Sequence, residues 1–249
     1  MSQQLSGKIA LVTGGSRSIG AAIVRRFATD GAAVAFTYSA ASAQAQQLAA
    51  DIAAAGGKAY AIKADSADPA QVRAAVAATV ERFGGLDILV NNAGILSRGM
   101  IDDFALEEFD RMLAVNVRAV FVGVQAALPN LKAGSRVITT GSVAAQRAGF
   151  PGSSVYSMTK AAVGALTRGL ARDLGPRGIT VNAIAPGPTA TDMTADPAMR
   201  DMIVPMMPMM PIGRLGTPED VASLAAWLAG PEAGFVNGAS LTIDGGFMA

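Results

Sequence analysis

The chain has 249 residues, 51% of them hydrophobic, and its 20 basic and 19 acidic side chains leave a net charge of +1. It has no cysteine and no histidine, which excludes disulfides, the usual zinc sites, a thiol nucleophile and a Ser-His-Asp triad. We therefore expect no metal site, and proton transfer must use Tyr, Lys, Ser, Asp or Glu. The balanced charge, without a basic run, predicts no nucleic-acid partner. The opening "MSQQLSGK" lacks an apolar signal core, and no run approaches the ~18 apolar residues of a membrane span, so we expect a cytoplasmic protein with no membrane partner.

Short apolar runs bounded by Gly, Asp or Asn alternate with Ala-rich helical stretches along the chain. The predicted strands are 8–13, 33–38, 58–63, 86–91, 135–140, 178–184 and 240–244, and the predicted helices are 19–29, 42–55, 69–83 and 154–174. Asp68 is the expected cap of the third helix, because Pro69 follows at the first helical position. The alternation predicts an α/β fold of the Rossmann type, a doubly wound parallel sheet of about seven strands with helices on both faces. We see no dividing linker and expect 1–249 to form a single domain.

One segment, about 192–213, interrupts this alternation. It is rich in proline, which cannot continue a long helix. It also contains much of the chain's methionine, at Met193, Met199, Met202, Met206, Met207, Met209 and Met210. Two interpretations stay open: a packed excursion in which methionine fills irregular gaps, or a substrate lid over an apolar ligand. The lid is favoured because the segment follows the carboxyl end of a strand, where ligands bind in open α/β sheets.

The loop "TGGSRSIG" at 13–20 stands between the first strand and a helix. Glycine permits the tight turn, and the helix N-terminus offers free amides and a partial positive charge to a pyrophosphate. In this position the loop predicts a dinucleotide site, with a plain structural turn as the alternative.

The end of the second strand favours NADP(H) over NAD. Sites selective for NAD place an acid there, whereas this chain has the sequence "TYSA" at 37–40. Arg17 is expected to pair with the 2′-phosphate, and the hydroxyls of Ser16, Tyr38 and Ser39 to donate to it. An exposed arginine at a helix start is the alternative for Arg17.

A further set of motifs follows in order along the whole chain. Tyr156 and Lys160 form Tyr-x-x-x-Lys, 14 residues after Ser142. The other motifs are "NNAG" at 91–94, Asn116 in "LAVNVRA", Pro186-Gly187 after a strand, and "TIDGG" at 242–246. With the glycine loop, these motifs resemble the short-chain dehydrogenase/reductase family, in its 3-oxoacyl-reductase-like or ketone reductase branch.

The resemblance implies roles for four catalytic residues. Tyr156 would be the general acid that gives its phenolic proton to a carbonyl oxygen as hydride arrives from the nicotinamide. Lys160, one helical turn on, would stabilise the phenolate, hold the nicotinamide ribose and draw the tyrosine pKa from ~10 toward working pH. Ser142 would hydrogen-bond the substrate carbonyl, and Asn116 would support a water-mediated proton relay to the lysine.

The resemblance also assigns the cofactor positions. They are Gly14, Ser16, Arg17, Ser18, Ile19, Gly20, Tyr38, Ser39, Asp65, Ser66, Asn92, Ala93, Gly94, Pro186, Gly187, Thr189 and Thr191. Asp65 would contact the adenine or cap a helix, and Thr189 would contact the carboxamide. Ser18 departs from the family pattern, which has glycine there. Its side chain would crowd the pyrophosphate or, as we favour, cap the helix and bond a phosphate oxygen.

The predicted substrate pocket is mainly apolar, which favours a small or medium, uncharged ketone or the corresponding alcohol. Its candidate walls are Leu96, Ser97, Val143, Ala144, Phe150, Met193 and the methionine-rich segment. A 3-oxoacyl-acyl-carrier-protein reductase is an alternative that would need a basic surface, for which the segment 128–136 offers only Lys132 and Arg136.

A second alternative is a regulator on the same fold. The segments "ADSAD", "GLARDLGPRGIT" and "WLAGPEA" resemble a bacterial branch of cyclic dinucleotide-binding dispersal regulators, and fold alone does not establish catalysis. The family resemblance further implies a homotetramer. The last residues, 247–249, would reach a neighbouring subunit's pocket or fray.

Overall fold

The computed structural model describes residues 3–195 and 201–249, and its centre is a seven-stranded parallel sheet in the order β3-β2-β1-β4-β5-β6-β7. The strands are β1 (Ile9–Val12), β2 (Ala33–Tyr38), β3 (Lys58–Lys63), β4 (Ile88–Asn91), β5 (Arg136–Thr140), β6 (Thr180–Pro186) and β7 (Ser240–Ile243). The chain runs outward from β1 to β3 and then returns to place β4 on the other side of β1. This reversal leaves a crevice at the carboxyl ends of β1 and β4, where ligands bind in such sheets. The predicted fold class is confirmed.

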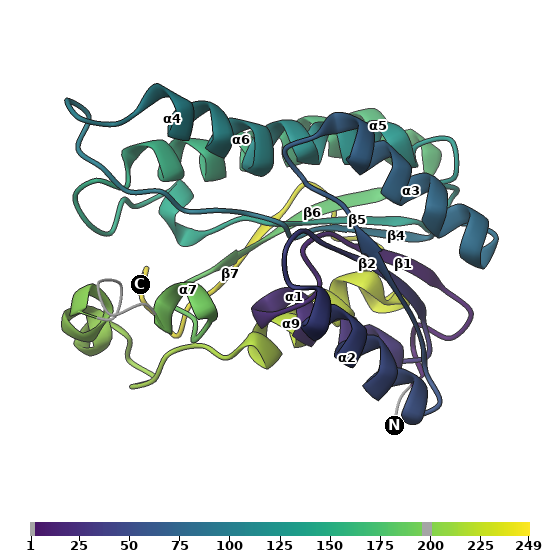
Figure 1. Ribbon diagram of the computed structural model, residues 1–249. Helices are drawn as coiled ribbons and strands as arrows, with labels where there is room; N and C mark the ends of the chain where they lie inside the picture. Colours follow the sequence, from purple (N-terminus) through teal and green to yellow (C-terminus); the bar gives the residue numbers. More distant parts are fainter. Residues whose placement is uncertain (1–2, 196–200) are drawn as a thin grey trace.

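Helices cover both faces of the sheet (Figure 1). One face carries α1 (Ser18–Thr29), α2 (Ser42–Ala54) and α9 (Pro218–Ala229), and the other carries α3 (Pro69–Phe83), α4 (Leu106–Leu113), α5 (Ala119–Ala127) and α6 (Ser154–Leu174). Phe27 and Phe36 are fully buried on the first side, and Leu89 and Val137 are buried on the second. In the part of the chain that the structure describes, no helix combines the length and the apolar character needed to cross a membrane.

The helix boundaries follow local chemistry. The Asp68 carboxylate accepts hydrogen bonds from the amides of Ala70 and Gln71, at 2.8 and 3.4 Å, and Pro69 stands at the first helical position. The predicted cap of α3 is confirmed, and Gly84 ends the helix with a φ of +85°.

Two of the longer helical regions were not predicted. One is α9, and the other runs from α4 through a π-helical turn, η1 (Ala114–Arg118), into α5. Such a turn is often found where a helix is adapted to a functional site, and this one contains Asn116.

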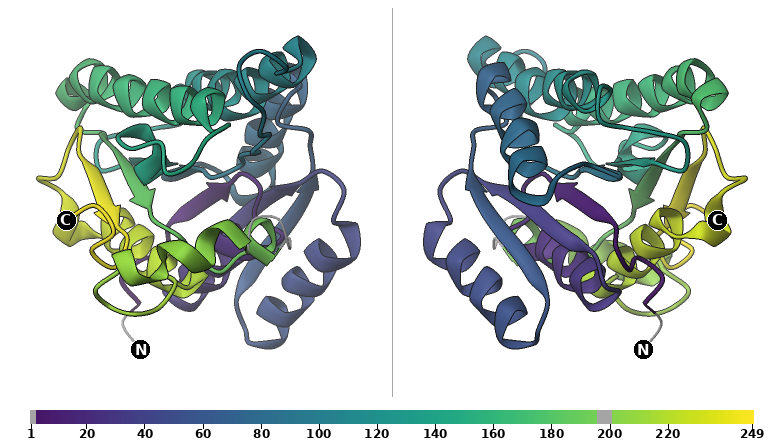
Figure 2. Two further views of the ribbon diagram at one scale, coloured as in Figure 1. Left: turned by 90° about the vertical axis from the view of Figure 1, so that its left-hand side faces the viewer. Right: turned by 90° about the vertical axis from the view of Figure 1, so that its right-hand side faces the viewer.

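The segment after β6 begins with α7 (Asp192–Ala195) and continues through the 3₁₀ helix η4 (Val204–Met209) at the carboxyl end of the sheet (Figure 2). Positions 196–200, which include Met199, lie outside the described residues. Met210 is buried against Val143 and Phe247, so here methionine fills a gap, as in the packed interpretation. The remaining short helices are η2 (Val143–Ala145), η3 (Gly175–Arg177) and η5 (Pro231–Ala233).

Candidate dinucleotide and substrate site

A cavity of about 870 Å³ opens at the carboxyl ends of the strands. Every position predicted to contact the cofactor lines it: the loop after β1 (Gly14, Ser16, Arg17, Ser18, Ile19, Gly20), the end of β2 (Tyr38, Ser39), the loop after β3 (Asp65, Ser66), the loop after β4 (Asn92, Ala93, Gly94) and the loop after β6 (Pro186, Gly187, Thr189, Thr191). Residues from five loops therefore share one wall, because parallel strands end at the same edge of the sheet.

The loop after β1 is held by the strands on either side. The Gly14 amide donates to the Thr37 hydroxyl at 3.0 Å, and the Asn92 side chain donates to the Thr13 and Gly14 carbonyls at 3.0 and 3.1 Å. A Cβ on Gly20 would lie 2.1 Å from the Gly14 carbonyl oxygen, so no side chain fits at this position. The turn is tight enough to place the free amides at the start of α1 at the cavity wall, where a pyrophosphate fits.

Ser18 has a φ of +49°, the only positive value for a residue other than glycine among those described. This conformation explains why glycine suits the position. Its hydroxyl accepts a hydrogen bond from the Asp192 amide at 3.1 Å, while α1 has no side-chain cap. The prediction that the Ser18 hydroxyl caps the helix is wrong, because the hydroxyl instead accepts the backbone amide of Asp192.

Arg17 also reaches Asp192, with 3.4 Å between Nη1 and a carboxylate oxygen. The two side chains are 66% and 58% exposed. In the protein without cofactor, the Arg17 guanidinium that is expected to bind a 2′-phosphate is therefore paired with the Asp192 carboxylate. At the end of β2, the cavity wall runs from Thr37 to Ala41 without an acid.

Two roles were considered for Asp65, contact with the adenine and capping of a helix. Asp68 caps α3, whereas Asp65 lines the cavity and accepts a hydrogen bond from the Ala67 amide at 2.8 Å. The helix-capping alternative for Asp65 is excluded by this arrangement.

The cavity fits a dinucleotide in size and in chemistry. Its volume exceeds what a single small substrate needs. One end is lined by the glycine loop and an acid-free strand end, and the other by apolar side chains and a tyrosine. Within residues 3–195 and 201–249, no cluster of three or more acidic side chains is arranged to hold a metal ion.

Three of the predicted catalytic groups converge at the cavity wall. Ser142 follows β5, and its hydroxyl accepts a hydrogen bond from the Ala144 amide at 3.1 Å. Tyr156 lies in the first turn of α6 and Lys160 one turn later. The Lys160 ammonium donates to the Thr140 carbonyl at 2.8 Å and lies 5.7 Å from the centre of the Tyr156 ring.

Burial moves the two titrating groups away from their ordinary pKa values. It raises the pKa of the Tyr156 phenol, and a hydrogen bond with Ser142 opposes that rise only in part. Burial also lowers the pKa of Lys160 to about 8. The prediction that Lys160 draws the tyrosine pKa toward neutrality is wrong for the protein alone, because desolvation of the phenolate dominates. At neutral pH the phenol keeps its proton and can serve as an acid.

Asn116 lies behind the wall rather than on it, with 2% of its surface exposed. Its amide nitrogen donates to the Ile95 carbonyl at 2.9 Å and to the Thr159 hydroxyl at 3.1 Å, and its oxygen accepts from the Ile95 amide at 2.9 Å. Asn116 thus fixes the loop after β4 against α6. A Cβ on Gly94 would lie 3.4 Å from the Lys160 nitrogen and 3.5 Å from the Asn116 oxygen, so both groups converge behind that glycine.

The substrate end of the cavity contains the predicted side chains and several that were not predicted. Leu96, Val143, Ala144, Phe150 and Met193 line it as expected. The unpredicted lining residues are Arg111, Val115, Arg147, Gly149, Ser153, Ile203, Met206 and Phe247. Ser97 is absent from the wall because its hydroxyl donates to Glu108.

The chain terminus is placed differently from either expectation. Phe247 is 3% exposed and packs against Val143 and Met210 of its own chain. The Arg147 guanidinium stacks over the Phe247 ring at 5.3 Å. Phe247 is therefore neither frayed nor extended toward a neighbour, and no local pattern in the sequence indicated this contact.

The two basic residues considered for a carrier protein lie away from the cavity. Arg136 starts β5 and is largely buried, and Lys132 is 3.6 Å from the Asp87 carboxylate. Lys132 precedes β5 and Arg136 is its first residue, so both stand at the amino end of that strand, opposite the cavity.

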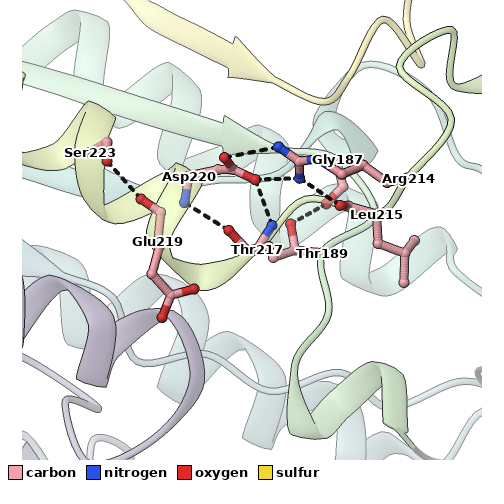
Figure 3. Close-up of polar contacts among 8 residues, drawn as sticks. All are labelled: Gly187, Thr189, Arg214, Leu215, Thr217, Glu219, Asp220 and Ser223. Atoms are coloured by element: carbon pink, nitrogen blue, oxygen red, sulfur yellow. Dashed lines mark hydrogen bonds and ion pairs between the residues drawn. The ribbon is translucent and has the colours of Figure 1, made fainter.

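A polar network stands at the start of α9, beside the loop after β6 (Figure 3). Arg214 makes two contacts with the Asp220 carboxylate, at 2.7 and 3.2 Å, and Asp220 forms a capping box with Thr217. These interactions hold the pKa of the Asp220 carboxyl well below its usual range. Gly216 bonds the loop on both sides of Thr189, through Pro188 and Ala190. These two backbone hydrogen bonds position Thr189 at the cavity.

Comparisons with known proteins agree with this geometry. A family model described as enoyl-(acyl carrier protein) reductase matches residues 14–248. A solved short-chain dehydrogenase from Burkholderia cenocepacia J2315, in complex with NADP, is 54% identical with a TM-score of 0.95, and the match covers 99% of this chain and 100% of that one. A solved blue fluorescent protein from a metagenomic library, in complex with NADPH, is 47% identical with a TM-score of 0.93, covering 99% and 100%.

A relative by sequence is the cyclic-di-GMP-binding biofilm dispersal mediator protein of Escherichia coli (strain K12), 46% identical over 247 residues and 98% of both chains. Fold, cavity and comparisons define an oxidoreductase built on the Rossmann plan. The chain belongs to the short-chain dehydrogenase/reductase family, which confirms the resemblance found in its motifs.

Proposed function

We propose that the protein reduces a ketone to a secondary alcohol with NADPH, reversibly, using Tyr156 as general acid and base. The observation that carries this proposal is a protonated phenol, a hydroxyl and a buried amine gathered at the wall of a dinucleotide-sized cavity. This set supplies a proton donor, a carbonyl ligand and a positive charge without histidine.

Each residue has a separate task. Ser142 donates a hydrogen bond to the substrate carbonyl and holds its oxygen beside Tyr156. Tyr156 gives its proton to that oxygen as the carbonyl carbon accepts hydride, and the ammonium of Lys160 stabilises the phenolate that remains. Asn116 keeps the loop after β4 in place and supports the proposed relay that returns a proton to Lys160. The bound nicotinamide would supply the hydride.

The residues present suit NADP(H). The acid-free end of β2 leaves Arg17, Tyr38 and Ser39 to bind a 2′-phosphate, which matches the NADP and NADPH held by the two structural relatives. Asp65 would contact the adenine and Thr189 the carboxamide. For the substrate, the mainly apolar wall favours a small or medium, uncharged ketone. We further propose a cytoplasmic homotetramer.

The test follows NADPH absorbance with cyclic, aryl and β-keto ester ketones, and NADH in parallel. We expect turnover with NADPH far above NADH. The Tyr156→Phe variant should bind NADPH with unchanged affinity, because the phenolic proton is not a cofactor ligand, yet lose most of its reduction rate. Equal activity of this variant and the wild type would remove the assignment of the proton donor.

The Escherichia coli relative gives a second candidate, a cyclic dinucleotide-binding regulator. Binding of cyclic di-GMP without NADPH turnover on any ketone would favour it. A 3-oxoacyl-acyl-carrier-protein reductase would instead turn over 3-oxoacyl thioesters far faster than simple ketones. The family model's description also names an acyl carrier protein, but for the reduction of an enoyl rather than a 3-oxoacyl group. Lys132 and Arg136 lie away from the cavity, so neither supplies the basic surface that this alternative would need.

A further inference from the structure

Two contacts join opposite walls of the cavity at a single residue. Asp192 donates its amide hydrogen to the Ser18 hydroxyl and pairs its carboxylate with Arg17. Ser18 and Asp192 are 174 positions apart in the chain, and all three residues line the cavity. Asp192, the first residue of α7, therefore makes a hydrogen bond and an ion pair with the loop expected to bind the cofactor phosphates.

The backbone conformation of Ser18 is unfavourable for a residue with a side chain, and the hydrogen bond to its hydroxyl offsets this cost. A side chain at a φ of +49° is disfavoured relative to glycine. The hydroxyl does not cap α1, which has no side-chain cap. It instead accepts a hydrogen bond from the Asp192 amide. Serine at this position therefore keeps Asp192 beside Arg17.

The Arg17–Asp192 pair is weaker than the Arg–Asp pair that stands just beyond the segment after β6. There, Arg214 and Asp220 make two contacts, reinforced by the Thr217 capping box (Figure 3). Arg17 and Asp192 make one contact of 3.4 Å between exposed side chains. An exposed pair of this kind is readily exchanged for a stronger anion.

We propose that Asp192 competes with the cofactor's 2′-phosphate for Arg17 and so adjusts the preference for NADPH over NADH, an inference that rests on the proposed use of NADP(H). The phosphate monoester carries more negative charge than a carboxylate and presents three oxygens, so it displaces the Asp192 carboxylate from the Arg17 guanidinium. Binding of NADPH then includes breaking the Arg17–Asp192 pair. Binding of NADH leaves the pair in place, because NADH has no 2′-phosphate.

The experiment measures dissociation constants of NADPH and NADH by nucleotide fluorescence, and those of adenosine 2′,5′-bisphosphate and 5′-AMP by calorimetry. Four proteins are compared: wild type, Asp192→Asn, Arg17→Ala and the double variant. Asp192→Asn should tighten NADPH and the bisphosphate about two- to fivefold, the range expected from releasing an exposed ion pair, and leave NADH and 5′-AMP unchanged. In the Arg17→Ala background the same substitution should have no selective effect.

Two further variants check specificity. Asp51→Asn removes another exposed Arg–Asp pair, which Asp51 of α2 makes with Arg25 of α1 at 2.9 Å. This pair lies outside the cavity lining, so the substitution should change no dissociation constant. Ser18→Ala keeps the Cβ and removes the hydroxyl, so it should tighten NADPH selectively, though less than Asp192→Asn.

Equal tightening of NADPH and NADH by Asp192→Asn would overturn the proposal, because it would indicate repulsion of the shared diphosphate. An unchanged NADPH constant would overturn it as well. Failure of the proposed function looks different, since the wild type itself would then bind neither cofactor or reduce no ketone.

Discussion

Tyr156 and Lys160 show how one environment separates the pKa values of two neighbours. The same loss of water raises the pKa of the phenol and lowers that of the amine, because the charged form is disfavoured in each case. The spacing in the sequence indicated that the pair interacts. It did not indicate the direction of the tyrosine shift, since burial depends on packing contributed by the whole fold.

We expect a pH limb near 8 in kcat/KM for NADPH, which reports on the free enzyme. Burial lowers the Lys160 pKa from its ordinary 10.5 to about 8, so the ammonium is lost as pH rises through 8. The rate constant should fall about tenfold per pH unit above that value. The tyrosine, with its raised pKa, keeps its proton through this range. A profile that stays flat to pH 10 would contradict the role of the charged lysine.

Motifs that follow strand ends line one cavity because the topology of the sheet brings strand ends together. This accounts for every predicted cofactor position and for Leu96 and Val143. The contacts of Arg17 and Ser18 with Asp192, and of Phe247 with Val143, were not predictable. They join distant parts of the chain, and no periodicity or turn pattern reports such contacts.

At the scale of elements, α3 and α9 begin with the same kind of chemistry. Asp68-Pro69 was recognised, whereas Thr217, Pro218 and Asp220 form an equally clear helix start that was missed. The π-helical turn around Asn116 is different. Its sequence carries no distinguishing residue, and the turn lies where α4, α5 and α6 come together.

We expect Asp220→Ala to lower the free energy of unfolding by about 1–2 kcal/mol, because it removes a helix cap and a partly exposed ion pair together. Urea titration at pH 7 measures this change. The carboxyl's pKa is held below its usual range, so its stabilisation is present above about pH 4 and is lost as pH falls through the lowered value. The difference between variant and wild type should therefore shrink in strong acid. Asp51→Ala, which removes an exposed pair with Arg25 and a hydrogen bond from Gln47 but no helix cap, should cost less.

At the scale of the molecule, the exposed large apolar side chains include two sets that lie on different elements. Leu106, Phe121 and Met158 stand on α4, α5 and α6, and Phe235, fully exposed, stands between α9 and β7. Apolar surface of this kind is common at interfaces between subunits. Two different patches suit a tetramer with two kinds of interface, in line with the homotetramer that we propose.

Light scattering after size-exclusion chromatography tests the assembly. The wild type should be a tetramer, and Phe121→Lys and Phe235→Lys should each leave dimers, because each places a charge in one kind of interface only. The double variant should be a monomer. A wild-type monomer at micromolar concentration would contradict the proposal.

The methionines at the substrate end give the protein a particular sensitivity to oxidants. The chain has twelve methionines and no cysteine, and Met193 and Met206 line the cavity. Peroxide therefore finds thioethers rather than thiols, and each sulfoxide formed turns part of an apolar wall polar. Oxidative stress would alter which molecules the pocket accepts while leaving the groups that move the proton intact. Recovery would depend on methionine sulfoxide reductases, since there is no thiol for a disulfide reductant to restore.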